Sequence, residues 1–215
     1  MLRGRCNPIT EHAMSEIAHV VATIFRKAGK AERLVVAIAG PPGAGKSTIA
    51  EGIAALLPDN SVAVVPMDGF HYDDAVLSAR GLSSRKGAPE TFDFPGFEIL
   101  LRRIRSREPD IAIPVFDRSI ELSRAAAAII RAETRFILVE GNYLLLDEAP
   151  WDRLAPLFDM TIFIDLPREV LERRLLQRWQ DHGRPDAEAR AWVASNDMPN
   201  VDRVMGRRRP ADLVI

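Results

Sequence analysis

A glycine-rich segment carries the clearest chemical pattern in the chain. Residues 40–47 read Gly-Pro-Pro-Gly-Ala-Gly-Lys-Ser and match G-x-x-x-x-G-K-[ST] at every fixed position. Glycines let backbone N–H groups turn toward phosphate oxygens, while the lysine reaches the terminal phosphates and the serine hydroxyl binds Mg²⁺. The pattern therefore predicts a site for a nucleoside triphosphate with magnesium, formed by Gly40, Gly43, Ala44, Gly45, Lys46, Ser47 and Thr48.

Two acidic residues follow apolar segments that are typical of buried strands. Asp68 comes directly after the segment 61–67, and Glu140 ends the segment 136–140. In a parallel sheet both would lie at the edge where such sheets bind ligands. A carboxylate at Asp68 can take the proton from an attacking hydroxyl group, and one at Glu140 can hold Mg²⁺ directly or through water. The alternatives are a turn at Asp68-Gly69 and a solvated strand end at Glu140.

A third group of candidates lies on one predicted helix. Arg174, Arg178 and His182 are spaced i, i+4 and i+8 and share a helix face, and Arg184 follows its end. Cations near a helix C-terminus are ordinarily favourable to the helix dipole and often do nothing more. In a phosphotransferase the same arrangement suits a helical lid, at about 173–200, whose arginines close on the transferring phosphoryl group. We therefore predict catalytic roles for Arg174 and Arg178.

Other polar residues are candidates for binding a second substrate. Asp93 precedes Pro95 and is typical of a helix N-cap, yet its carboxylate can equally accept a hydrogen bond from a substrate hydroxyl group. His71 and Tyr72 follow Asp68 closely, and a core or surface position is as compatible with them as an acceptor pocket. These alternatives stay open at the level of sequence.

The segments between these residues predict how they are held. Residues 34–39, before the glycine-rich loop, are apolar throughout, as expected of a buried parallel strand, and a helical pattern follows the loop. Alternating strands and helices favour an α/β fold with a doubly wound parallel sheet. The remaining predictions are strands at 61–67, 111–116, 136–140, 160–164 and 211–215, helices at 11–28, 125–130 (from alanine propensity), 167–182 and about 185–195, helix starts at 93–95 and 150–151, and a loop at 81–92.

Composition limits the classes of partner. The 215 residues suit a single domain, 1–215, and the net charge of −1, from 29 basic and 30 acidic residues, gives no bulk field for nucleic acid or membrane. The lone Cys6 excludes an internal disulfide and fits a reducing compartment. Residues 1–8 lack the apolar core of a secretory signal. We therefore expect a cytoplasmic protein whose partner is a small molecule, and a homodimer is left open.

The chain resembles the group of P-loop kinases that contains uridine kinase, bacterial pantothenate kinase and phosphoribulokinase. The similarity runs from about residue 33 to the C-terminus and rests on residues 40–47, 67–71, 85–93, 114–117, 140–145 and the arginine helix. It implies a P-loop NTPase fold with a five-stranded sheet of order 2-3-1-4-5, helices on both faces and a mobile arginine lid. It further implies Mg-ATP as phosphoryl donor, Asp68 as base, Ser47 and Glu140 at magnesium, and Asp93 on the acceptor.

Two departures from the uridine kinase pattern bear on the acceptor. Uridine kinases carry P-V-Y-D followed by a histidine four residues after the aspartate, and here Phe116 and Glu121 stand at the tyrosine and histidine positions. Losing donors that a pocket uses for recognition lowers selectivity by orders of magnitude, so a nucleoside acceptor is less favoured. In the lid pattern, Gln177 takes the place of an arginine.

Together these features predict an ATP-dependent kinase of a small-molecule hydroxyl group. The chain is similar to a bacterial nucleoside/nucleotide kinase-like branch labelled fructose transport system kinase, which favours a sugar such as fructose. Pantothenate or a nucleoside is the alternative within the family, and an NTP-hydrolysing regulator accessory to a transporter is the alternative from another class. The regulator alternative lacks support, because the sequence contains neither the guanine-binding motif N-K-x-D nor the LSGGQ signature of transporter ATPases. The predicted acceptor-binding residues are Asp93, His71, Asp117 and Arg118, with Asp68 and Glu121 as further acids.

Overall fold

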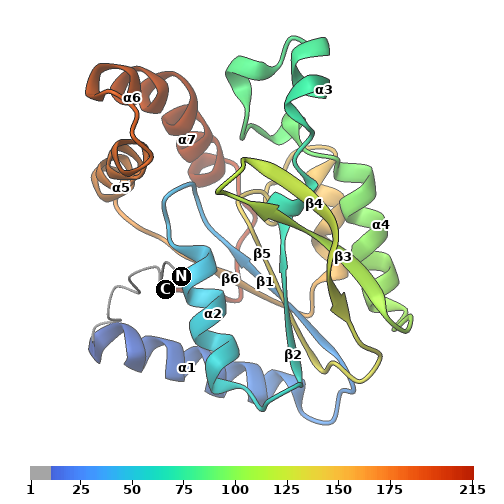
Figure 1. The fold of residues 1–215 in the computed structure, drawn as a ribbon. Coiled ribbons are helices and arrows are strands. Elements are labelled where there is room, and N and C mark those ends of the chain that lie inside the picture. The colour runs from blue at the N-terminus through green and yellow to red at the C-terminus, as the bar shows by residue number, and fades with distance from the viewer. Residues whose placement is uncertain (1–10) are drawn as a thin grey trace, which may run out of the picture.

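A five-stranded parallel sheet forms the centre of the computed structural model, which describes residues 11–215 (Figure 1). The strand order is β2-β5-β1-β6-β7, which is 2-3-1-4-5 when these five are counted along the chain, so the predicted order is confirmed. The expectations about Cys6 and the N-terminal segment lie outside the described residues. The strands are β1 (Leu34–Ala39), β2 (Val62–Pro66), β5 (Phe136–Gly141), β6 (Met160–Phe163) and β7 (Leu213–Val214).

Helices cover both faces of this sheet, as predicted. Successive side chains of β1 alternate between two apolar cores, because neighbouring residues of a strand point to opposite faces. On one face, α1 (Glu11–Ala28) and α2 (Lys46–Leu56) pack on Val36 and Ile38. On the other, α4 (Phe94–Arg105) and the 3₁₀ segment Trp151–Leu157 pack on Val35 and Ala37. The chemistry-bearing residues therefore have to gather at an edge of the sheet.

The segment 111–130 differs from the sequence prediction. The helix expected at 125–130 was wrong, because β4 (Leu122–Ile130) pairs antiparallel with β3 (Ile111–Asp117) in a separate two-stranded hairpin (Figure 1). The strand at 111–116 is confirmed, although it lies outside the central sheet. Long-range pairing with β3 and burial of Ile130 outweigh the helix propensity of four alanines. The hairpin places residues 114–123 beside the end of β2.

Residues 168–206 form a helical unit at one end of the sheet (Figure 1). The long helix predicted at 167–182 is α5 (Arg168–Asp181), followed by α6 (Asp186–Trp192). The last predicted helix was too short, since the chain continues through a π-helix at Val193–Asp197 into α7 (Met198–Gly206). Because α5 packs on α6 and α7, the predicted lid is one connected helical unit.

The remaining segments are short. Residues 81–92, predicted as a loop, contain the 3₁₀ turns Ser83–Arg85 and Pro89–Thr91, and α3 (Asp74–Ala79) precedes them. The short helix predicted after Pro150 is confirmed as Trp151–Leu157. None of the helices within residues 11–215 is both long and apolar enough to cross a membrane.

Candidate active site

The glycine-rich loop joins β1 to α2 and borders a cavity of about 380 Å³. Gly43 and Gly45 adopt φ of +81° and +91°, values that L side chains rarely adopt, so glycine is needed at both positions. Gly45 is the N-cap of α2, and the first N–H groups of this helix are available to phosphate oxygens. The loop therefore has the backbone expected of an anion cradle.

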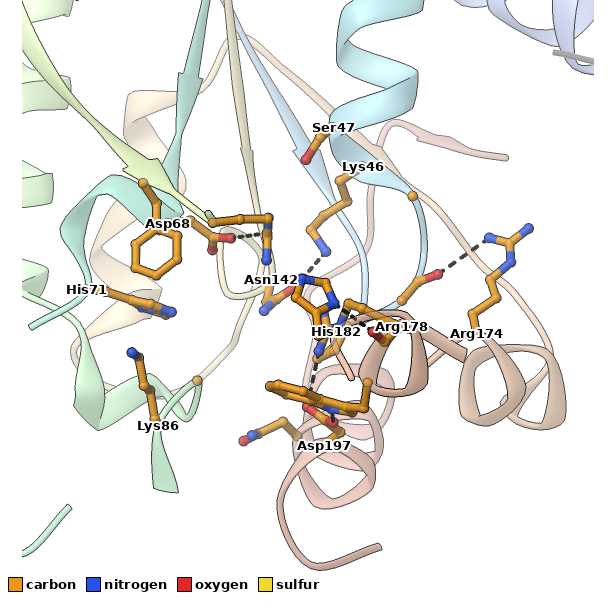
Figure 2. A pocket seen from close by; sticks show the side chains of 18 of the residues that line it. Lys46, Ser47, Asp68, His71, Lys86, Asn142, Arg174, Arg178, His182 and Asp197 are labelled. Carbon is orange, nitrogen blue, oxygen red and sulfur yellow. Dashed lines mark hydrogen bonds and ion pairs between the residues drawn. The ribbon is translucent and has the colours of Figure 1, made fainter. Parts of the chain in front are cut away.

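Lys46 extends from the start of α2 into the cavity (Figure 2). Its Nζ donates to Asn142 Oδ1 at 2.5 Å and to the carbonyl oxygen of Pro41 at 3.1 Å. Burial lowers the pKa of Lys46 from 10.5 to about 8, although the Glu140 carboxylate partly opposes this shift. The ammonium group is thus held close to the loop in a place where an anionic ligand would stabilise its charge.

Ser47 and Glu140 form the pair expected at magnesium. Ser47 Oγ donates to Glu140 Oε1 at 3.2 Å, and Glu140, on β5 between Ile38 of β1 and Pro66 of β2, is only 6% exposed. Burial raises the pKa of Glu140, and the nearby Asp68 carboxylate adds to the increase. A hydroxyl oxygen beside a buried carboxylate fits Mg²⁺, which takes few protein ligands and several from phosphate and water. Consistently, no group of three or more His, Cys, Asp or Glu side chains within residues 11–215 could hold a metal alone.

Asp68 lies in the 3₁₀ turn Met67–Phe70, which directly follows β2. Its carboxylate lines the same cavity as Lys46 and Ser47, and Arg118 Nη2 donates to it at 2.6 Å. Gly69 is required here, because a Cβ atom would lie 2.5 Å from the carbonyl oxygen of Pro114. This close approach of the hairpin to the turn brings Arg118 to Asp68.

The same side of the cavity holds several groups suited to a polar acceptor. Lys86, Phe116, Arg118 and Glu121 line it together with His71. The His71 ring packs against Phe92 with 4.0 Å between centroids and 50° between the ring planes, and burial lowers the pKa of His71 to about 4, so it is neutral near pH 7. Among the described residues, the buried His71 Nδ1 has no hydrogen-bond partner, which leaves it available to a ligand.

The helical unit supplies the opposite wall. Arg174 Nη1 donates to the carbonyl oxygens of Gly43 and Ala44, at 3.4 and 3.3 Å, and Arg178 forms an ion pair with Asp197 at 3.6 Å. His182 also lines the cavity, and Figure 2 shows it beside Arg178. Arg184 instead lies over the rings of Trp179 and Trp192, at 4.4 and 5.0 Å from their centroids. The structure thus brings three of the four predicted lid residues to the cavity.

Three predicted acceptor residues lie elsewhere. Asp93 Oδ1 accepts from the N–H of Gly96 and caps α4, which agrees with the simpler of its two interpretations. Asp117 is held by Ser119 and Arg124 in the hairpin turn, and Tyr72 is covered by Arg80. None of the three lines the cavity. The expected ring of four carboxylates is therefore reduced to Asp68 and Glu121.

Sequence reasoning missed several side chains of the cavity wall. No role was predicted for Lys86, Asn142, Trp179, Trp192, Asp197 and Asn200, all of which line the cavity. The first two lie within segments that carry the family resemblance, so position within those segments was an available signal. Nothing in helical spacing indicates the last three, because they depend on how α6 and α7 pack.

The fold and this site together define a P-loop kinase, with candidate groups for binding phosphate, for binding magnesium and for general base catalysis around one cavity. The model of the Phosphoribulokinase / Uridine kinase family matches residues 35–215, and the chain belongs to this family. It is an ATP-dependent small-molecule kinase that uses ATP with Mg²⁺.

Individual relatives agree with this assignment. A crystal structure described as "putative fructose transport system kinase", from Silicibacter sp. TM1040, is 40% identical, with a TM-score of 0.85 over 93% of this chain and 98% of that one. The uncharacterized protein YggC of Escherichia coli (strain K12) is 36% identical over 97% of this chain and 88% of its own length. A pantothenate kinase of Limosilactobacillus reuteri is 31% identical over 67% of this chain, but over 49% of its own length.

Proposed function

We propose that the protein transfers the γ-phosphoryl group of ATP to a hydroxyl group of a small polar acceptor bound between the P-loop, the β3–β4 hairpin and the helical unit. The observation that carries this proposal is the position of Asp68, which lines the same cavity as Lys46 and Ser47 but comes from a different strand end. The phosphate cradle and the candidate base thus lie on two sides of one space.

The proposed roles follow from the chemistry of each group. Bound Mg-ATP supplies the phosphoryl group and a divalent charge, and the P-loop N–H groups, Lys46 and the Ser47–Glu140 pair would hold it. Asp68 would accept the proton of the attacking hydroxyl group at its carboxylate. Arg118, now on that carboxylate, has to release it or share it with the acceptor. Arg174 and Arg178 would stabilise the negative charge that passes between donor and acceptor.

For the acceptor we propose a sugar or sugar-like polyol such as fructose. Asp68 and Glu121 offer oxygen acceptors, while Lys86 and Arg118 offer donors, a mixture that suits several hydroxyl groups. Phe116 is an aromatic residue of the cavity wall, but Lys86 Nζ lies over its ring at 5.7 Å from the centroid, and the His71 ring lies nearly perpendicular to it with 5.2 Å between centroids. Its ring is thus already in contact on two sides, which disfavours stacking of a nucleobase.

A hydroxy acid of the pantothenate type is the second candidate. The four acids predicted around the acceptor, Asp68, Asp93, Asp117 and Glu121, would together repel a carboxylate. However, Asp93 and Asp117 do not line the cavity, whereas Lys86 does. The two remaining acids are each paired with a cation, Asp68 with Arg118 at 2.6 Å and Glu121 with Lys86 at 3.6 Å. A carboxylate on the acceptor would therefore meet paired acids, and it could compete for Lys86 or Arg118. The reaction would take place in the cytoplasm, and a homodimer stays a prediction.

The test is ADP release with Mg-ATP against sugars, sugar acids, pantothenate, glycerate and nucleosides. We expect turnover to depend on an added acceptor and to be fastest with a sugar. The Asp68→Asn variant should lose this turnover, whereas Asp117→Asn, the same change in the hairpin turn outside the cavity, should keep it. ATP hydrolysis that no acceptor stimulates would refute the kinase proposal in favour of an NTP-hydrolysing regulator, and a preference for uridine would refute the choice of acceptor.

A further inference from the structure

The π-helix Val193–Asp197 is a part of the helical unit that borders the cavity. A π-helix is rare and often occurs at a functional site, because its wider turn redirects side chains. This one interrupts the helical run from α6 to α7, and its last residue, Asp197, lines the cavity. Its neighbour Asn196 donates from Nδ2 to the carbonyl oxygen of Lys86, at 2.8 Å. The π-helix thus contacts the loop that carries an acceptor-side cation.

Asp197 itself is a buried charge with two partners on α5. The residue is 7% exposed, and its Oδ2 accepts from Trp179 Nε1 at 2.6 Å. Its Oδ1 lies 3.6 Å from Arg178 Nη2. A carboxylate this deeply buried is costly unless it is paired, so the pair and the indole hydrogen bond are needed together.

Arg178 is held in place by these contacts. Its guanidinium lies 5.2 Å from the Trp179 ring centroid, and Asp197 fixes the position of that same ring. A free arginine side chain has many rotamers, and holding it in one of them costs conformational entropy. The contact with Asp197 is a single one at 3.6 Å, which leaves other N–H donors of the guanidinium free. Figure 2 shows Arg178 and Asp197 on the same side of the cavity, beside His182.

The other lid arginine is held differently. Arg174 donates to the carbonyl oxygens of Gly43 and Ala44, and within residues 11–215 it forms no hydrogen bond or ion pair with the π-helix. Its position therefore depends on the P-loop, whereas the position of Arg178 depends on an acidic residue that comes 19 positions later in the chain. Because of this difference, a mutation at Asp197 should affect the position of Arg178 and leave that of Arg174 unchanged.

We propose that Asp197 is a positioning residue, which holds the guanidinium of Arg178 inside the cavity for contact with the transferring phosphoryl group. The proposal rests on the proposed kinase function, in which Arg178 contacts that group. Asp197 acts through Arg178 and Trp179 and does not itself touch the nucleotide. The roles proposed above for the P-loop, Asp68 and Arg178 do not include this function of Asp197.

A double-mutant cycle tests this dependence. Asp197→Asn keeps the shape and an oxygen that accepts from Trp179, but it removes the charge that pairs with Arg178. Since misplacing a catalytic group by about 1 Å costs on the order of 100-fold in rate, we expect kcat to fall by about 10- to 100-fold with little change in the KM for ATP. In an Arg178→Ala background, the same substitution should change kcat by less than about twofold, because effects that pass through one residue are not additive.

Asp202→Asn is the matched control. Asp202 of α7 pairs with Arg168 of α5 at 2.9 Å on the outer surface, so this acid also ties α5 to the helical segment after α6, but away from the cavity. This variant should keep the kcat of the wild type. An equal loss of kcat from Asp197→Asn with and without Arg178 would overturn the proposal and indicate direct contact of Asp197 with the acceptor. A kcat for Asp197→Asn within about twofold of the wild type would also overturn it.

A second measurement does not depend on turnover. Protein labelled with 5-fluorotryptophan gives separate ¹⁹F signals for its tryptophans, and Trp179→Phe identifies the signal of residue 179. We expect Asp197→Asn and Arg178→Ala to shift or broaden this signal and Asp202→Asn to leave it unchanged. An unchanged signal in Asp197→Asn would contradict the positioning role. Should the wild type only hydrolyse ATP without an acceptor, the proposed function fails, and the same cycle on the hydrolysis rate together with this signal still decides the role of Asp197.

Discussion

Replacing Lys46 with methionine should have opposite effects on nucleotide binding and on the stability of the free protein. Methionine keeps most of the length of the lysine side chain and removes its charge. In nucleotide-free protein that charge is held where burial lowers the lysine pKa from 10.5 to about 8. At about 1.4 kcal/mol for each pH unit, the charged form costs about 3 kcal/mol of folding free energy near pH 7.

Removing the buried charge should stabilise the folded protein, but the loss of the hydrogen bonds of Lys46 offsets part of this stabilisation. Methionine cannot donate to Asn142 Oδ1 or to the carbonyl oxygen of Pro41. Asn142 lines the cavity, where water can replace the lysine, whereas Pro41 is buried outside it, and one unsatisfied buried acceptor costs about 1–3 kcal/mol. The net effect on unfolding free energy therefore lies between about zero and about 2 kcal/mol of stabilisation. At about 2–4 °C for each kcal/mol, the Tm of the nucleotide-free variant should be unchanged or higher by several degrees.

The effect on nucleotide binding is larger and has the opposite sign. A unit charge about 4 Å from a phosphate charge is worth about 4 kcal/mol at an effective dielectric constant of about 20. We therefore expect the affinity for Mg-ATP and kcat/KM to fall by about 1,000-fold. Calorimetric titration with Mg-ATP and thermal unfolding without nucleotide or magnesium measure the two effects on the same sample.

The difference in unfolding free energy between the Lys46→Met variant and the wild type should also depend on pH. Below pH 8 the folded protein carries the Lys46 charge, and the full cost is present. The cost disappears as the pH rises from about 8 toward 10.5, because the folded protein has lost this proton while the unfolded chain still holds it. Over this range the stability of the variant relative to the wild type should therefore fall by about 3 kcal/mol, and the variant should become the less stable of the two. A variant that unfolds well below the wild type at pH 7, or that still binds Mg-ATP with wild-type affinity, would refute the reasoning.

Three further substitutions test the other site residues. Asp68→Asn is nearly isosteric but cannot take up a proton, so kcat should fall by about 100-fold or more with ATP affinity retained, and a rise in acceptor KM alone would mean that Asp68 only orients the acceptor. Glu140→Gln should raise the Mg²⁺ concentration needed for half-maximal activity, since the cation loses an anionic oxygen; an unchanged magnesium titration would remove Glu140 from the metal site. Asp93→Ala should lower the Tm by the loss of about 1 kcal/mol of N-cap energy while leaving the acceptor KM unchanged, and a raised KM at constant Tm would restore its role in binding the acceptor.

The local parts of the site could be predicted from the sequence. The motif at 40–47 specifies its own conformation, because its glycines allow the positive φ angles found at Gly43 and Gly45 and its neighbours form a strand and a helix. Asp68 and Glu140 were found for a similar reason. Each follows or ends a continuous apolar segment, and the ends of parallel strands meet at one edge of the sheet. Strand order came from the resemblance, since nothing in a local pattern specifies which strands are neighbours.

Only the tertiary structure decided which of the remaining polar residues face the cavity. Residues 125–130 have a helical preference as an isolated segment, but pairing with β3 makes them a strand and brings Arg118 to Asp68. Asp93 and Asp117 have acidic side chains that suit an acceptor site, yet the N–H of Gly96 and the hairpin turn occupy them. Asp197 reaches Arg178 because a π-helix turns it toward α5, across a separation in sequence that no periodic pattern spans. Contacts between distant segments determine these positions, and their energies outweigh the local preferences that a sequence displays.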